Sequence, residues 1–229
     1  MAHIDLIIPA YNEAHSIPSV LAEVPKLVRE IVVVDNNSTD ETGLRASNGG
    51  ATVLREPQKG YGHACLKGIN YVLQKSEPPD IIVFMDGDYS DYPEDLVQIV
   101  QPIAAGEVDL VIGSRVKALR ETGSMTPQQV FGNWLATTLM RIIFNSRFTD
   151  LGPFRAIRTE ALKGLKMEDK TYGWTVEMQL KALKNKLAYA EVPVRYKKRI
   201  GVSKVSGTVK GSIFAGIKIL HWIFKYSFK

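Results

Sequence analysis

The sequence contains one cysteine, no long uninterrupted apolar run, and no repeated or low-complexity segment. Because Cys65 is alone, an internal disulfide and a cysteine-rich zinc site are both excluded, and a reducing compartment is expected. The apolar run near the N-terminus is short and is interrupted by Pro9, so it matches neither a signal peptide nor a membrane-spanning helix. These absences predict a cytoplasmic protein.

The remaining composition is that of a basic globular protein. The chain has 229 residues, of which 45% are hydrophobic and 23% charged, and its net charge is +5. A chain of this length is expected to bury a sufficient core in one domain. The positive charge indicates an anionic partner, which is nucleic acid, a membrane surface or a phosphorylated substrate. Nucleic acid is disfavoured because the Lys and Arg residues are not interleaved with aromatic residues in a recognised motif.

Short apolar runs rich in β-branched residues alternate with helical stretches as far as Arg115. The expected strands are residues 4–9, 30–35, 51–56, 80–86 and 108–115, and the expected helices are residues 16–28, 41–47, 62–75 and 94–105. Apolar strands without polar alternation are usually buried on both faces, and their alternation with helices favours a parallel sheet. The pattern therefore predicts a Rossmann-like α/β/α sandwich with a mostly parallel central sheet.

The alternation stops beyond Arg115. Helices are expected at about residues 128–144 and 174–184, and an edge strand within residues 187–196. No linker rich in proline or serine separates this part of the chain from the first. We therefore expect it to cover the site of the same domain.

The last 19 residues, GSIFAGIKILHWIFKYSFK, have the period of an amphipathic helix with Trp222 and Tyr226. Its expected apolar face comprises Ile213, Phe214, Ile217, Leu220, Phe224 and Phe228, and its expected basic face comprises Lys218, His221, Lys225 and Lys229. No charge-free run approaches the roughly 20 residues that span a bilayer, so an interfacial position on anionic lipid is expected. A helix docked on the core, or an oligomer contact, is the alternative. The expected division is a catalytic domain at 1–210 and a membrane-interface helix at 211–229.

Five carboxylates follow one expected strand within ten positions, at Asp86, Asp88, Asp91, Glu94 and Asp95. Capping of the next helix by Asp91 or Tyr92 would explain part of this cluster. Asp86 and Asp88 differ because they flank a glycine at the end of the strand, where a sharp turn points both side chains at one spot. Two close carboxylates repel each other unless a cation lies between them, and Mg²⁺ or Mn²⁺ takes such ligands together with substrate phosphate. We therefore expect this pair to bind a metal that holds a diphosphate.

Five motifs in this order resemble family 2 glycosyltransferases of the GT-A fold: PAYNEAHSI, VVVDNNSTDET, KGYGHACLKGI, MDGDYSDYPEDL and VIGSR. The later segments DLGPFRAI, GWTVEMQLKA and EVPVRYKKRIGVSKVSG are also similar to the branch of dolichol-phosphate mannose synthases and polyprenyl-phosphate glucosyltransferases. The resemblance covers the chain from Ile4 to Gly207.

The resemblance implies a role for each matching residue. Contacts with the nucleobase and ribose are implied for Pro9, Tyr11, Glu13 and Asp35. Metal binding is implied for Asp86 and Asp88, with Asp88 as the more direct ligand. Phosphate groups of the donor and the acceptor are implied to face Arg115, Arg199, Ser203 and Lys204, and we expect Asp88, Arg115 and Arg199 to act in catalysis.

Two positions depart from the pattern of this branch. Gln58 stands where a lysine is common, with Lys59 one position later, which puts a donor contact there in doubt. Ser90 stands where some members have a glutamine that supports the metal. The role of Glu177 is open, since it either approaches the site or pairs with a neighbouring lysine.

The resulting hypothesis is a metal-dependent, inverting glycosyltransferase that is peripheral on the cytoplasmic face of a membrane. It would move mannose or glucose from a GDP- or UDP-sugar to a polyprenyl or dolichyl phosphate. A lipid phosphate is already anionic, whereas a hydroxyl acceptor needs a general base, and the sequence offers no unambiguous base. A hydroxyl acceptor, such as a glycan, glycolipid or small metabolite, and a noncatalytic nucleotide-sugar-binding module are the alternatives. An oligomer is also compatible with the sequence.

Overall fold

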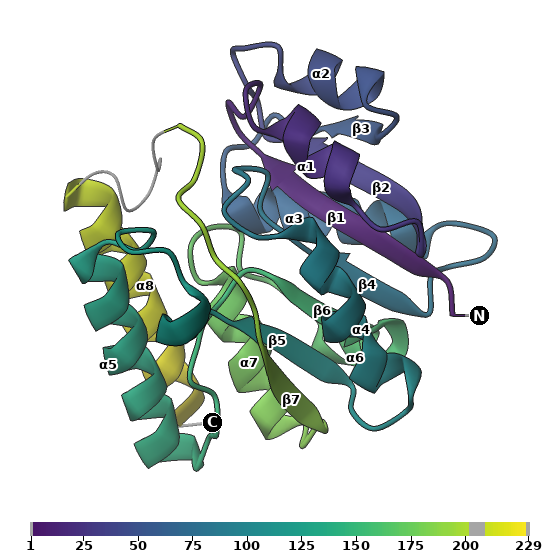
Figure 1. Ribbon diagram of the computed structural model, residues 1–229. Coiled ribbons are helices and arrows are strands. Elements are labelled where there is room, and N and C mark those ends of the chain that lie inside the picture. The colour runs from purple at the N-terminus through teal and green to yellow at the C-terminus, as the bar shows by residue number, and fades with distance from the viewer. Residues whose placement is uncertain (1, 202–208, 228–229) are drawn as a thin grey trace.

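The apolar runs of the sequence form one seven-stranded sheet with the strand order β3-β2-β1-β4-β6-β5-β7 (Figure 1). The computed structural model describes residues 2–201 and 209–227. Every neighbouring pair of strands is parallel except the two pairs made by β6, which is antiparallel to both β4 and β5. The strands are β1 (Ile4–Ala10), β2 (Val28–Asp35), β3 (Thr52–Arg55), β4 (Ile81–Phe84), β5 (Leu110–Ser114), β6 (Arg155–Arg158) and β7 (Tyr189–Pro193).

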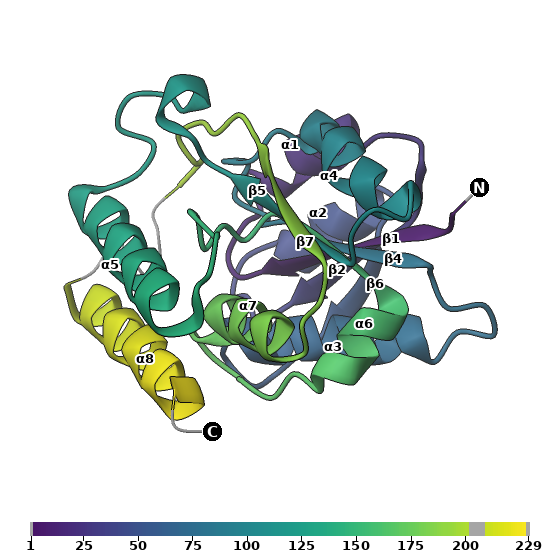
Figure 2. The same cartoon turned by 90° about the horizontal axis from the view of Figure 1, so that it is seen from below.

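Helices connect the strands and cover both faces of the sheet (Figure 2). Short 3-10 turns, η1 (Pro93–Asp95) and η2 (Lys117–Leu119), follow β4 and β5. The α-helices in the described parts of the chain are α1 (Ile17–Glu23), α2 (Thr42–Asn48), α3 (Tyr61–Leu73), α4 (Leu96–Ala104), α5 (Pro127–Phe144), α6 (Thr159–Leu165), α7 (Trp174–Lys184) and α8 (Val209–Ser227).

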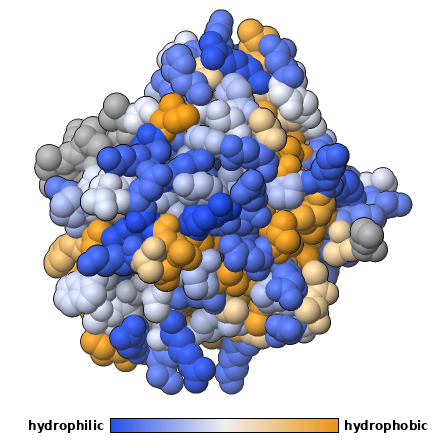
Figure 3. Space-filling view, viewed as in Figure 1, coloured by the Kyte–Doolittle hydropathy of each residue, from blue (hydrophilic) through white to orange (hydrophobic). Residues whose placement is uncertain are grey.

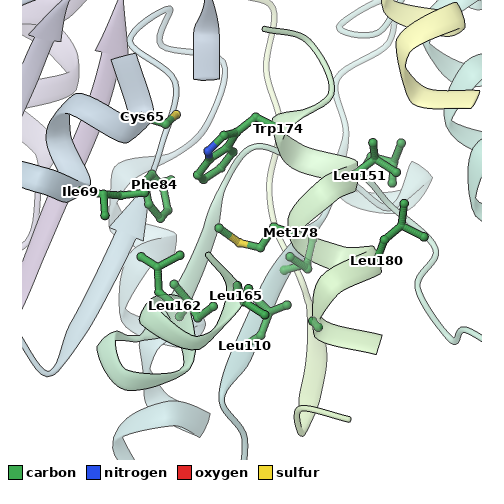
Figure 4. Packing of buried hydrophobic residues seen from close by; sticks show 14 of the residues in the cluster. Cys65, Ile69, Phe84, Leu110, Leu151, Leu162, Leu165, Trp174, Met178 and Leu180 are labelled. Atoms are coloured by element: carbon green, nitrogen blue, oxygen red, sulfur yellow. The ribbon is translucent and has the colours of Figure 1, made fainter. Parts of the chain in front are cut away.

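The core consists of two apolar clusters, one on each face of the sheet. Strand β1 contributes to both, because Leu6 and Ile8 face the cluster with α1 and α4 whereas Ile7 faces the cluster with α3, α6 and α7. Figure 4 shows the second cluster, in which the Trp174 ring lies edge-on to Phe84 with ring centroids 4.7 Å apart. Burial on both faces explains why the strands lack polar alternation.

Two elements do not follow from the sequence pattern. Strand β6 has four residues with an arginine at each end, and α6 follows it without a loop. So short a run with charged ends carries no buried-strand signal, and its pairing with β4 and β5 depends on tertiary contacts. The expected edge strand is confirmed by β7, which ends the sheet beside β5.

The helix α8 docks on the protein and also exposes an apolar row. Its Trp222, Ile223 and Tyr226 are buried in the cluster with α7. The docking predicted as an alternative is thus present, while Phe214, Ile217 and Phe224 of the expected apolar face are exposed. Phe228, Lys229 and the side chain of Ile213 lie outside the described part of the chain.

Helix α3 packs closely on the sheet at Gly68. A Cβ atom there would lie 2.6 Å from Cγ2 of Ile7, which is fully buried. We expect Gly68→Ala to lower the free energy of unfolding by about 1–3 kcal/mol, since overpacking a dense core forces neighbours to move. Gly164→Ala in α6, where a Cβ would meet no atom of the described residues within 4 Å, is the matched control and should be neutral or slightly stabilising. Urea unfolding of both variants measures this, and equal stabilities would contradict it.

Candidate active site

The expected site residues gather beyond the carboxyl ends of β1, β4 and β5, at one edge of the sheet. A cleft of about 520 Å³ opens there. It brings together seven of the residues singled out in the sequence: Pro9, Tyr11, Glu13, Asp86, Asp88, Arg115 and Arg199. Asp35 does not line the cleft, and Ser203 and Lys204 lie outside the described residues.

The end of β2 presents Asn36 to the cleft instead of Asp35. Asp35 Oδ1 accepts a hydrogen bond from the backbone N–H of Ser38 at 2.9 Å, which closes the turn after the strand. Asn36 links neighbouring loops, because its Nδ2 donates to the Gln58 carbonyl at 2.7 Å and its Oδ1 accepts from Gly60 N–H at 2.8 Å. Its place directly after the strand was the signal that could have identified it.

Lys59 supplies a positive charge at the same end of the cleft. Its Nζ donates to Tyr11 Oη at 3.1 Å and lies 4.9 Å from the centre of that ring. Both residues line the cleft. Gln58 stands where the resembling branch commonly has a lysine, and Lys59, the next residue, brings a lysine side chain to the cleft.

Asp86 and Asp88 lie on a tight turn after β4. Tyr89, the next residue, adopts φ 63°, a conformation that a bulky side chain rarely takes. Asp88 Oδ1 accepts hydrogen bonds from the backbone N–H of Ser90 at 2.9 Å and from its hydroxyl at 2.5 Å, and Asp88 Oδ2 forms an ion pair with Arg199. Ser90 thus orients Asp88, while Asp86 Oδ1 is buried with no hydrogen-bond partner among the described residues.

This loop holds negative charge in a buried setting. Burial, followed by the neighbouring Asp88 carboxylate, raises the pKa of Asp86 to about 7. No group of three or more His, Cys, Asp or Glu side chains forms a metal cage in the described chain. Asp86 and Asp88 instead provide two carboxylates, one with an unpartnered buried oxygen. That donor set fits a Mg²⁺ or Mn²⁺ ion whose other ligands are water and substrate phosphate.

Arg199 reaches Asp88 because residues 194–200, which follow β7, cross the acidic loop. Along this crossing the backbone N–H of Lys197 donates to the Ser90 carbonyl at 2.9 Å, and that of Ile200 donates to the Asp88 carbonyl at 3.0 Å. Although burial lowers the pKa of Arg199, the Asp88 and Asp86 carboxylates raise it above its usual value. Arg199 is therefore a fixed positive charge beside the carboxylate pair.

Arg115 is held at the cleft by Asp150, which the sequence reasoning missed. Its Nε and Nη2 donate to the two carboxylate oxygens of Asp150 at 2.9 and 2.5 Å, and its backbone N–H donates to the same group at 2.8 Å. The guanidinium carbon lies 5.2 Å from the centre of the Tyr196 ring. Asp150 begins the DLGPFRAI segment, so a recognised motif contained it, but nothing local connects it with an arginine 35 positions earlier.

Glu177 has a structural role. It is fully buried, its carboxylate pairs with Lys181 Nζ at 2.7 Å, and it accepts backbone N–H groups of Glu168 and Asp169 at 2.9 and 2.8 Å. It does not line the cleft. Pairing with a neighbouring lysine is therefore the correct one of the two roles left open.

Asp91 is a buried carboxylate and not a helix cap. The helix after the loop begins at Pro93 with Tyr92 at the N-cap, and no side chain caps it. Both carboxylate oxygens of Asp91 are buried and lack hydrogen-bond partners within the described residues. Burial, and then the charges of Asp86 and Asp88, raise its pKa well above the usual range. Of the two residues expected at the cap, Tyr92 occupies the N-cap position, whereas Asp91 forms a backbone bridge with Tyr196.

The raised pKa of Asp91 makes its ionised form unfavourable in the folded protein. The resulting loss of stability begins above the unfolded-state pKa of about 3.9 and grows with pH towards the native pKa. We expect Asp91→Asn to raise the midpoint of thermal unfolding in chelator by a few degrees, or about 1 kcal/mol, with a larger gain at pH 8 than at pH 5.

The matched control for Asp91 is Asp95, a buried carboxylate at the end of η1, which follows the same loop. Its Oδ1 accepts a hydrogen bond from Arg195 Nε at 2.9 Å. Asp95→Asn should therefore destabilise the protein at pH 8. Destabilisation by Asp91→Asn as well would show that the Asp91 carboxylate has a favourable partner.

Comparisons with known proteins identify the family. The family model described as Glycosyl transferase family 2 matches residues 5–165 of this chain. An uncharacterised glycosyltransferase of Mycobacterium tuberculosis is 36% identical over 215 residues, which are 93% of this chain and 94% of the relative. The undecaprenyl-phosphate mannosyltransferase of Micrococcus luteus is 30% identical over 229 residues, with 94% of this chain and 92% of the relative covered.

A solved structure with the same fold is glucosyl-3-phosphoglycerate synthase from Mycobacterium tuberculosis in complex with Mn²⁺, UDP and phosphoglyceric acid. Its TM-score is 0.78 at 21% identity, and the match covers 99% of this chain and 78% of that one. The predicted GT-A fold is thereby confirmed. The chain belongs to glycosyl transferase family 2 and is a nucleotide-sugar-dependent glycosyltransferase.

Proposed function

We propose that this glycosyltransferase moves mannose or glucose from a GDP- or UDP-sugar to a polyprenyl or dolichyl phosphate at the cytoplasmic face of a membrane. The observation that carries the proposal is a single cleft that contains the Asp86–Asp88 pair with Arg199 and also the anchored Arg115. Two separate cationic positions fit a reaction with one anionic donor and one anionic acceptor. The name of the Micrococcus luteus relative supports the same class of acceptor.

The donor diphosphate belongs at the acidic loop. Asp86 and Asp88 would hold Mg²⁺ or Mn²⁺, which supplies neutralisation of the negative charge that develops on the leaving diphosphate. Arg199 adds a fixed positive charge at the same place. Pro9, Tyr11, Glu13 and Asp35 remain the proposed contacts of the nucleobase and ribose, with Lys59 beside Tyr11, and Ser203 and Lys204 remain proposed phosphate contacts.

The acceptor phosphate belongs at Arg115. Asp150 fixes the guanidinium, so the phosphate can be oriented without loss of side-chain freedom at the moment of binding. An ionised phosphate oxygen attacks the anomeric carbon without a general base, and direct in-line displacement inverts that centre.

Asp88→Asn tests the donor half of the proposal. With Mn²⁺ present, UDP-glucose and GDP-mannose should be compared for their ability to raise the thermal unfolding midpoint, since a ligand of the folded state stabilises it. Asp88→Asn should abolish the metal-dependent rise and reduce transfer to a prenyl phosphate by about 100-fold or more. Asp109→Asn, which removes a carboxylate paired with Arg158 outside the cleft, should retain both properties.

The outcomes of this experiment separate the alternatives. Full transfer by Asp88→Asn, or by the wild-type protein in excess chelator, would remove the metal from the proposal. Transfer to a soluble hydroxyl acceptor but to no prenyl phosphate would favour the hydroxyl-acceptor enzyme. Donor binding without any release of nucleoside diphosphate would favour the binding module.

Membrane attachment is proposed to involve the outer face of α8, so the catalytic unit would be residues 1–210 and the interfacial helix residues 211–229. The described residues contain no helix of sufficient length and apolar character to cross a membrane. The sequence after Glu191 has nine Lys or Arg residues and no Asp or Glu. Exposed Phe214, Ile217 and Phe224 in this basic segment support reversible attachment to anionic lipid.

Replacement of Phe214, Ile217 and Phe224 by serine tests the attachment. These side chains are 52%, 57% and 47% exposed, so the fold should persist. We expect cosedimentation with phosphatidylglycerol-containing vesicles to fall about tenfold or more, because burial of apolar area contributes about 25 cal/mol per Å². The matched control replaces Leu44, Val97 and Leu119, which are 59%, 50% and 45% exposed elsewhere on the protein. Equal vesicle binding by both triple variants would end the membrane proposal.

A further inference from the structure

Helix α7 buries an amide side chain at Gln179. Polar residues dominate the face of the molecule seen in Figure 3, but Gln179 is fully buried. Its neighbours Met178 and Leu180 belong to the apolar cluster shown in Figure 4. Its Nε2 donates a hydrogen bond to the Asp150 carbonyl at 2.9 Å, whereas its Oε1 is buried without a hydrogen-bond partner among the described residues. One hydrogen bond adds little net stability and an unpartnered buried oxygen is costly, so stability alone does not explain the amide.

Glu191 of β7 holds the other side of the Asp150 peptide. Its Oε1 accepts hydrogen bonds from the backbone N–H of Asp150 at 3.0 Å and of Thr149 at 2.7 Å. Its Oε2 accepts from the Thr149 hydroxyl at 2.6 Å. The N–H and the carbonyl of Asp150 are therefore both bound by side chains of elements that lie far away in the sequence.

Asn133 of α5 fixes the peptides on each side of Asp150. Its Nδ2 donates to the Thr149 carbonyl at 3.0 Å, and its Oδ1 accepts from the Leu151 N–H at 2.9 Å. Both Asn133 and Leu151 line the cleft. Side chains from α5, α7 and β7 thus hold three consecutive residues of a loop that has no regular structure of its own.

The loop held in this way carries the anchor of Arg115. The two Asp150 carboxylate oxygens accept hydrogen bonds from Arg115 Nε and Nη2, and the same carboxylate accepts from the Arg115 backbone N–H. Because these bonds are short and the pair is largely buried, a shift of the Asp150 backbone would move the guanidinium with it. A displacement of about 1 Å at a reacting centre can reduce the rate substantially.

We propose that Gln179 is a positioning residue for the transfer reaction. It acts together with Asn133 and Glu191, through Asp150, on the guanidinium of Arg115. This inference rests on the proposed function, in which Arg115 binds the acceptor phosphate. Gln179 does not line the cleft, so its effect is transmitted by the Asp150 peptide.

Gln179→Met tests the inference, because methionine has a similar length but donates no hydrogen bond. Transfer to farnesyl phosphate is measured below its micelle concentration and without vesicles, from UDP-glucose or GDP-mannose. We expect kcat/KM for farnesyl phosphate to fall about tenfold, mainly through a higher KM. Donor-dependent thermal stabilisation with Mn²⁺ should be unchanged. The unfolding midpoint should move by only a few degrees, since the variant removes an unpartnered oxygen but also leaves a carbonyl without its donor.

A double substitution shows whether Gln179 acts through Arg115. Arg115→Lys retains the positive charge but cannot reproduce the paired hydrogen bonds to Asp150, so it should itself lower kcat/KM. Adding Gln179→Met to Arg115→Lys should lower kcat/KM by less than about twofold further, because two residues that act as one unit are not additive. Independent effects would instead multiply.

The matched control is Thr159→Val at the start of α6. Thr159 is buried outside the cleft, and its hydroxyl donates to the Pro79 carbonyl at 2.5 Å, so the variant also removes a side-chain donor from a backbone carbonyl. It should retain wild-type transfer kinetics. Wild-type kinetics in Gln179→Met, a matching loss of donor binding, or additive losses in the double variant would overturn the inference while the proposed function stands. If the wild-type protein transfers sugar to no prenyl phosphate, the proposed acceptor fails and the inference fails with it.

Discussion

Repulsion between buried carboxylates after β4 is the constraint on which the site depends. Asp86, Asp88 and Asp91 lie within one turn, and burial raises the pKa of both Asp86 and Asp91. Part of this cost is offset within the described chain by the ion pair between Asp88 and Arg199 and by the hydrogen bonds that Ser90 donates to Asp88. A folded protein with such unfavourable electrostatics gains stability when a cation and its anionic ligand bind there. The same constraint explains why residues 194–200 cross the loop, because this crossing brings Arg199 to the carboxylates.

The antiparallel strand β6 provides the second cationic position. Strand β6 lies between β4 and β5, and the segment before it crosses the carboxyl end of β5. The crossing is close, because a Cβ atom added at Gly152 would lie 2.6 Å from the Gly113 carbonyl oxygen. This close approach places Asp150 against Arg115. A parallel strand in this position would require the chain to enter from the opposite edge of the sheet. The strand with the weakest sequence signal therefore determines where Arg115 and Asp150 lie in the cleft.

Local patterns predicted the parallel core and the Asp86–Asp88 pair, because apolar runs and a turn between two carboxylates are readable within a few residues. The missed features depend on distant contacts. Asp150 acquires its role from an arginine 35 positions earlier, and Asp91 resembles a cap until its bridge to Tyr196 buries it. The helix α8 shows both effects, since its period is local, but which residues dock on α7 and which stay exposed is decided by tertiary packing.

The α/β core by itself does not specify an acceptor, since one fold supports many substrates through the elements added to it. In this chain those elements are α5 and α8, and each combines a glycine that faces the cleft with large apolar side chains that face outward. A helix pair that served only to cover the core would gain stability from alanine at both glycine positions. The glycines at these positions therefore keep open space in the wall of the cleft at a cost in helix stability.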